Sequence, residues 1–122
     1  MFAVKHRNDG KINSHKWFFQ GVCKYLKPEF CLMLDIGTKP LENALLKLYN
    51  FMKIDEHCGG CCGEIEVDLT ETNSTESYML QVSQFYEYKL GHTPDKCAES
   101  FFGFTSVLPG AYSLFRWKAI KG

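Results

Sequence analysis

Short apolar runs alternate with amphipathic segments along the chain. The runs at residues 1–5, 30–34, 64–68 and 104–108 are apolar or alternate in polarity, which is typical of strands. Between them, residues 14–26, 40–52, 76–90 and 111–120 carry apolar side chains at helical spacing. Strands that alternate with helices predict an α/β fold, with a mainly parallel sheet and helices on both faces.

Polar and helix-breaking residues set the expected boundaries. We expect Ser14 to cap the first helix and Pro28 to end it. Pro40 suits the first turn of the second helix. Residues 69–75 are expected to form a polar loop, and residues 91–94 to break the third helix.

Composition narrows the class of protein. The chain has 122 residues, of which 45% are hydrophobic and 23% are charged, so we expect one globular unit, 1–122, with no internal boundary. Lys and Arg number 14, and Asp and Glu number 14, so the basic excess of a nucleic-acid binder is missing. We expect no secretory signal, and no apolar run approaches the roughly 20 residues that span a bilayer.

Six cysteines raise the question of disulfides or metal. Without a secretory signal, we interpret them as reduced and mostly buried. Cys58 and Cys61 form a C-x-x-C with His57 beside it, but a second pair of zinc ligands is missing. A zinc or redox module is therefore the weaker hypothesis.

Two loops that follow predicted strands carry candidate chemistry. Gly10 and Lys11, just before a predicted helix, suit a phosphate, although the motif alone favours a simple turn and helix cap. Asp35 ends the apolar run 30–34. A carboxylate there can hold a divalent metal or a ribose hydroxyl, or it can simply cap the junction.

Six segments, taken in series, resemble the chitin synthases. They read GKINSHKWFF at residues 10–19, LDIGTKP at 34–40, GGCCGEI at 59–65, QFYEYK at 84–89, ESFFGF at 99–104 and VLPGAYS at 107–113. The resemblance runs through nearly the whole chain, in the order and with the spacing of that family.

The resemblance implies part of a GT-A glycosyltransferase domain, which is Rossmann-like, from a membrane-embedded, processive, inverting enzyme. Such an enzyme transfers N-acetylglucosamine from UDP-N-acetylglucosamine to the non-reducing end of a growing chitin chain. It implies a divalent metal, Mg or Mn, which neutralises the departing diphosphate. It also implies a general base for the acceptor hydroxyl.

Donor-side roles are carried over from the same family. Lys11 would contact the donor diphosphate or uridine, and Asp35 would hold the nucleotide sugar or its metal. Gly37 and Thr38 belong to the same donor segment. Gly37 replaces the second Asp of the common D-x-D, as it does in chitin synthases.

Two further segments carry other implied roles. Pro109, Gly110 and Ser113 would form a loop on the acceptor side. Gln84, Glu87 and Tyr88 would lie on a helix that packs toward the membrane.

Several family motifs are not found in residues 1–122. These are the acidic-Asp-Arg motif that supplies the base, Q-x-x-R-W, the transmembrane helices and an upstream uridine-binding strand. The resemblance therefore implies an internal segment without the catalytic base, which is inactive alone. It also implies a full-length enzyme in the plasma membrane, with this segment facing the cytoplasm, and a homo-oligomer as one possible assembly.

Other functions stay open at this point. One is a synthase of another β-linked polymer, such as cellulose or hyaluronan, against which segments 10–19 and 107–113 argue. Another is a nucleotide-binding α/β module without catalysis.

Overall fold

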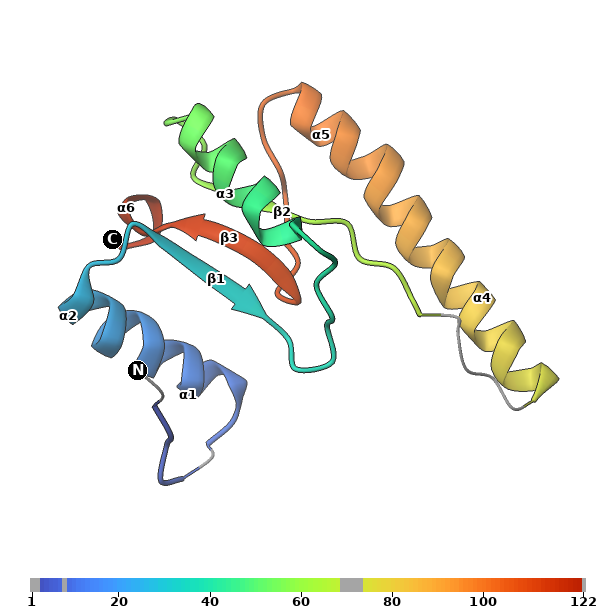
Figure 1. The fold of residues 1–122 in the computed structure, drawn as a ribbon, viewed down its shortest axis with the longest axis horizontal. Helices are drawn as coiled ribbons and strands as arrows, with labels where there is room; N and C mark the ends of the chain where they lie inside the picture. The colour runs from blue at the N-terminus through green and yellow to red at the C-terminus, as the bar shows by residue number, and fades with distance from the viewer. Residues whose placement is uncertain (1–2, 8, 69–73, 122) are drawn as a thin grey trace.

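The computed structural model describes residues 3–7, 9–68 and 74–121. Its described strands form a sheet in the order β1 (Phe30–Leu34), β3 (Tyr112–Arg116) and β2 (Gly60–Cys62) (Figure 1). β3 is the central strand and pairs antiparallel with both neighbours. In this register Leu34, at the end of β1, lies opposite Tyr112, at the start of β3.

The predicted parallel sheet is wrong for the described strands. Residues 64–68 and 104–108 form no strand, and Ala3–Lys5 lie outside any strand, while residues 1–2 lie outside the described part. Two strands instead occur at 60–62, which lies outside the predicted strands and helices, and at 112–116, where a helix was predicted. Because the central strand is buried on both faces, its run YSLF has no alternation to separate it from a helix.

The helix before β1 is longer than its pattern predicts. It runs through α1 (Lys11–Lys16), the π-helical η1 (Trp17–Cys23) and α2 (Lys24–Leu26). It begins before Ser14, whose hydroxyl donates to the Gly10 carbonyl at 3.2 Å, so the predicted Ser14 cap is wrong. It ends at Lys27, which has a φ of 48°, just before Pro28 as predicted.

The second helix, α3, spans Ala44–Ile54 and begins after Pro40 rather than at it. Asn43 has a φ of 60°, and this left-handed conformation interrupts the helix between Pro40 and Ala44.

The third helix extends well beyond its predicted end. α4 (Thr75–Leu90), the π-helical η2 (Gly91–Lys96) and α5 (Cys97–Phe101) follow one another without a break. Pro94 lies inside the π turn, where the wider backbone accommodates a residue that has no N–H. At the other end, Ser74 accepts from the Ser77 N–H at 3.3 Å, and the predicted loop before it lies largely outside the described residues.

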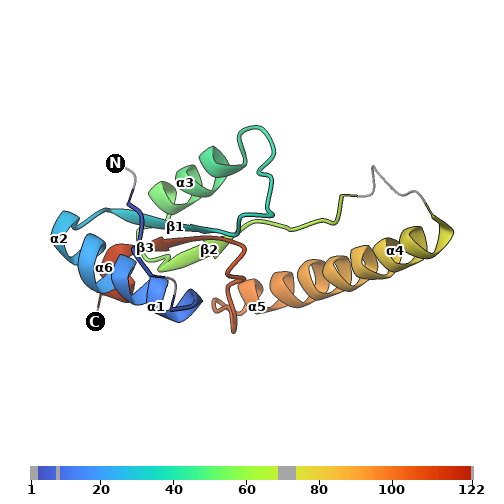
Figure 2. The same cartoon turned by 90° about the horizontal axis from the view of Figure 1, so that it is seen from below.

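Helices lie on both faces of the sheet, as predicted. Figure 2 shows α3 on one face and α1 with the short α6 (Trp117–Ile120) on the other, while α4 extends to one side. In the described part of the chain, none of the helices combines the length and apolarity required to cross a bilayer.

A small core fills the space between these layers. Its buried apolar side chains are 0–5% exposed and come from the first helix, β1, α3 and β3: Cys23, Cys31, Met52, Tyr112 and Leu114. Phe19 stacks on Trp117 at 6.5 Å between ring centres, which joins the first helix to α6.

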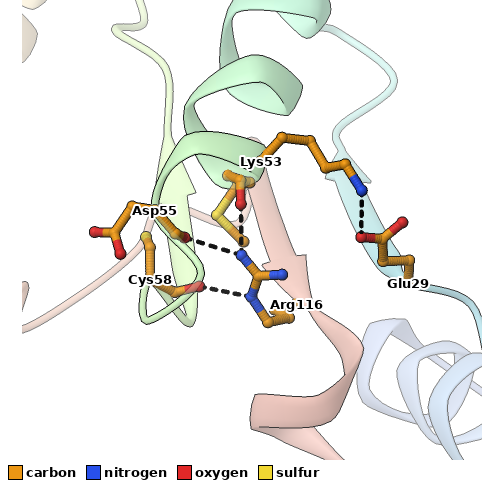
Figure 3. Close-up of polar contacts among 6 residues, drawn as sticks. Glu29, Lys53, Asp55, Cys58 and Arg116 are labelled. Carbon is orange, nitrogen blue, oxygen red and sulfur yellow. Dashed lines mark hydrogen bonds and ion pairs between the residues drawn. The ribbon is translucent and has the colours of Figure 1, made fainter.

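Arg116 connects β3 to the end of α3 (Figure 3). Its Nη2 donates to the carbonyls of Met52 at 2.5 Å and Asp55 at 3.0 Å, and its Nε donates to the carbonyl of Cys58 at 3.0 Å. The guanidinium also lies 5.0 Å from the ring centre of Phe30 in β1. One side chain therefore links β1, β3, α3 and the turn before β2.

Replacing Arg116→Met should lower the free energy of unfolding by about 2–4 kcal/mol, because three carbonyls lose a charged donor. Arg116→Lys should recover part of this loss, since it keeps the charge but lacks the planar fork. Urea unfolding followed by circular dichroism measures both. Lys118→Met, on exposed α6, is the control and should change stability by less than about 0.5 kcal/mol. Equal losses for Lys118→Met and Arg116→Met would contradict the role of Arg116.

The segment at β2 approaches β3 closely at Gly63. A Cβ on Gly63 would lie 2.4 Å from two ring carbons of Tyr112, which is buried. The Gly63 N–H donates to the Tyr112 carbonyl at 3.3 Å. The GGCCGEI segment therefore needs glycine here because the Tyr112 ring occupies the side-chain position.

Gly63→Ala should destabilise the chain by about 1–3 kcal/mol through this overlap. Gly91→Ala is the matched control, because its Cβ would meet nothing within 4 Å and Gly91 is helical. That variant should stabilise the chain by about 0.5–1 kcal/mol. Thermal unfolding of both variants tests the difference, and a neutral Gly63→Ala would show that Tyr112 moves aside freely.

Candidate functional site

Segments 34–40 and 107–113 meet where β1 ends and β3 begins. Asp35 follows β1 directly, and its N–H donates to the Ala111 carbonyl at 3.0 Å. This bond extends the β1–β3 ladder by one step and places Asp35 beside the loop 107–111.

Lys11 brings a third segment to the same place. Gly10, with a φ of 89°, precedes α1, and Lys11 is the first residue of that helix. The Lys11 Nζ lies 3.1 Å from Asp35 Oδ1. The two side chains are 61% and 48% exposed, so this Lys11–Asp35 pair is open to a ligand from solvent.

The loop 107–111, for which an acceptor-side role is predicted, borders the Lys11–Asp35 pair at Gly110. The Lys11 Nζ lies 3.8 Å from where a Cβ on Gly110 would stand. Ser113 is fully buried, and its hydroxyl donates to the Pro109 carbonyl. Ser113 thus holds the Pro109–Gly110 turn in shape, and a contact between these residues and an acceptor stays a prediction.

The turn that follows Asp35 is hydrogen-bonded and exposed to solvent. The Thr38 N–H donates to the Asp35 carbonyl at 2.9 Å, which closes the turn. Gly37 is exposed, and a Cβ there would meet nothing within 4 Å. The backbone next to Asp35 is therefore accessible to a ligand.

Asp35 fits a divalent metal only together with a phosphate ligand. Among residues 3–7, 9–68 and 74–121, no group of three or more His, Cys, Asp or Glu side chains forms a metal site. Mg²⁺ is commonly held by one or two carboxylates together with substrate phosphates, while water fills the remaining positions. One carboxylate beside a cation for the phosphate matches that donor set.

The structure places Gln84, Glu87 and Tyr88 on the exposed surface of α4 and does not bring them to the Lys11–Asp35 pair. The neighbouring Lys89 instead donates to Glu64 Oε1 at 2.6 Å and to Glu66 Oε1 at 2.5 Å. This hydrogen bond from Lys89 lowers the pKa of Glu64. Through Lys89, the QFYEYK segment thus links α4 by ion pairs to Glu64 and Glu66, which follow β2.

Glu99 anchors the loop before the acceptor-side segment. It accepts from the Ser106 N–H at 3.1 Å, from the Ser106 hydroxyl and from Lys96 Nζ at 3.2 Å. These contacts, led by the Ser106 hydroxyl, lower the pKa of Glu99. Neither this role nor that of Arg116 is predicted from the sequence, because both depend on partners that only the fold brings near.

All six cysteines are free. Cys23 and Cys31 are buried with their sulfurs 3.6 Å apart, Cys97 is exposed, and the other three are half-buried. Burial raises the pKa of Cys31 to about 12 and that of Cys61 to about 11. The prediction that the cysteines are mostly buried is wrong, because only Cys23 and Cys31 are buried, and their reduced state stays a prediction. Nothing in the described residues supports the zinc or redox module.

Comparison with known proteins decides the family. The family model described as the chitin synthase-like glycosyltransferase domain matches residues 1–122. The chain belongs to this family. The resemblance drawn from the six segments is thereby confirmed.

Three curated fungal relatives are similar over essentially the whole chain. Chitin synthase 2 of Mycosarcoma maydis is 43% identical over 122 residues, and chitin synthase C of Aspergillus oryzae is 43% identical over 121. Chitin synthase I of Metarhizium acridum is 41% identical over 121 residues. The match covers 99–100% of this chain but only 11–14% of these relatives.

Iodoacetamide at pH 8 should modify Cys97 first and leave Cys23 and Cys31 unmodified in the folded chain, because burial excludes the reagent from both side chains. Burial also raises the pKa of Cys31, which suppresses its reactive thiolate. Peptide mass spectrometry after timed labelling measures the order. Labelling in urea is the control and should modify all six. Fast modification of Cys31 in the folded chain would contradict its burial.

Proposed function

We propose that this chitin synthase domain supplies the donor site for transfer of N-acetylglucosamine from UDP-N-acetylglucosamine to chitin. The observation that carries the proposal is the Lys11–Asp35 pair, with Nζ and Oδ1 3.1 Å apart beside Gly110. It combines a cation for a diphosphate, a carboxylate for a divalent metal and the edge of the acceptor-side loop.

Each residue of the pair has a definite task in this proposal. Lys11 binds the donor diphosphate as a point charge. Asp35 holds Mg²⁺ or Mn²⁺ together with diphosphate oxygens, and the bound metal supplies charge neutralisation for the departing diphosphate. Gly37 and Thr38 leave the backbone beside Asp35 open to the donor.

The acceptor approaches over Pro109 and Gly110. Ser113 supports this turn from within the core, since its hydroxyl is committed to the Pro109 carbonyl. Inverting transfer needs a general base on the acceptor hydroxyl. We assign none of the described residues to that role, and we expect this chain to bind donor without making chitin.

Several properties of the whole enzyme belong to the same proposal, because the chain spans only 11–14% of the length of the curated relatives it matches. They are a GT-A fold for the complete domain, a plasma-membrane location with this segment on the cytoplasmic side, and a homo-oligomeric assembly. The exposed residues Gln84, Glu87 and Tyr88 on α4 would face the membrane side.

The donor site predicts that the 122-residue chain binds UDP-N-acetylglucosamine in the presence of Mg²⁺. Lys11→Met and Asp35→Asn should each weaken binding about 10- to 100-fold, the effect of losing a charge-assisted contact. Isothermal titration calorimetry measures the affinity.

The matched controls are Lys16→Met and Asp95→Asn, which remove an exposed charge elsewhere. They should bind like the unmodified chain. Donor affinity that is unchanged in Lys11→Met and Asp35→Asn would contradict the proposed site. Chitin formed by the purified chain would contradict the assignment of the base outside these residues.

A further inference from the structure

We propose that the Lys11–Asp35 pair couples metal binding to diphosphate binding, an inference that rests on the proposed donor site. Without donor, the Lys11 ammonium occupies the Asp35 carboxylate that the metal needs. The metal therefore enters as a complex with the nucleotide, whose diphosphate draws Lys11 away from Asp35.

Competition for one carboxylate is the first step of the argument. Lys11 Nζ is a full positive charge 3.1 Å from Asp35 Oδ1. A divalent ion at the same carboxylate is repelled by this ammonium unless Lys11 moves away, although exposure to solvent keeps the repulsion modest. The described residues gather no group of three or more ligating side chains, so the protein itself offers little to offset that repulsion.

Exchange of partners is the second step. The diphosphate gives Lys11 a new anion and gives the metal the oxygen ligands that the protein lacks. Each phosphoryl group of a nucleotide sugar carries one negative charge, so the complex of its diphosphate with a divalent ion is neutral. The neutral complex of metal and diphosphate inserts between Lys11 and Asp35, whose charges also cancel. The net charge of the site therefore does not change when the complex binds.

Room for the exchange is the third step. The Lys11 side chain is 61% exposed, so it can leave Asp35 without unpacking the core. It borders Gly110, which presents no side chain in its path, and a Cβ on Gly37, two residues after Asp35, would meet nothing within 4 Å. An exposed ion pair of this kind is weak enough for a phosphate to replace it.

Mn²⁺ binding to the chain, followed by the electron paramagnetic resonance signal of free Mn²⁺, tests the coupling with and without UDP, after subtraction of the Mn²⁺ that UDP binds without the chain. Mn²⁺ should bind the unmodified chain weakly alone and more tightly with UDP. Lys11→Met should bind Mn²⁺ alone about two- to fivefold more tightly, the worth of an exposed ion pair, and UDP should enhance its Mn²⁺ affinity less.

Three variants locate the effect. Lys11→Arg keeps the charge and should behave like the unmodified chain, whereas Asp35→Asn should lose Mn²⁺ binding under both conditions. Lys16→Met, on the same helix and exposed, is the matched control and should change nothing.

Unchanged or weaker Mn²⁺ binding in Lys11→Met would overturn the coupling. Mn²⁺ binding that is equally tight with and without UDP, in a chain that calorimetry shows to bind UDP, would overturn it as well. Failure of the proposed function gives a different result. In that case the chain binds no UDP, which rejects the donor site. A Mn²⁺ affinity that still rises in Lys11→Met would then support the competition between Lys11 and the metal for Asp35.

Discussion

The packing of the sheet depends on the guanidinium of Arg116. The last carbonyls of a helix have no N–H partner within it and form the negative end of its dipole, and Arg116 donates to Met52 and Asp55 there. Its own N–H donates to the Gly59 carbonyl at 2.9 Å, so the same residue also fixes the entry into β2. The guanidinium also lies over the ring of Phe30, so this one cation contacts the elements on both sides of the central strand.

The candidate site is a product of this ordered sheet. Asp35 lies beside Ala111 because β1 and β3 pair in one register, and the Lys11–Asp35 pair forms at the end of that ladder. The remaining family segments do not contact the Lys11–Asp35 pair and instead stabilise the surrounding fold. Segment 59–65 packs glycine against β3, segment 84–89 fastens α4, and Glu99 anchors the loop that leads to Gly110.

Sequence reasoning succeeded where local patterns were strong. The run 30–34 formed a strand and residues 76–90 formed a helix, as predicted. Asp35 follows a strand as expected, whereas Ala3–Lys5 form no strand before Lys11, and the roles of both residues stay predictions. It failed where long-range packing decides. β3 was read as a helix because its central position removes alternation, and a π turn carries the third helix through Pro94. Lys11 and Asp35 are 24 residues apart, so their contact follows from the fold rather than from spacing.

The shared register of β1 and β3 also restricts how chains of this fold can change in length. Since side chains alternate between the faces of a sheet, inserting or deleting one residue within Phe30–Leu34 or Tyr112–Arg116 would turn the rest of that strand over. Either change would carry Asp35 or Gly110 away from Lys11 and expose the buried side chains of β3. Length variation that preserves the site is therefore confined to the connections, such as the exposed residues between Thr38 and Ala44.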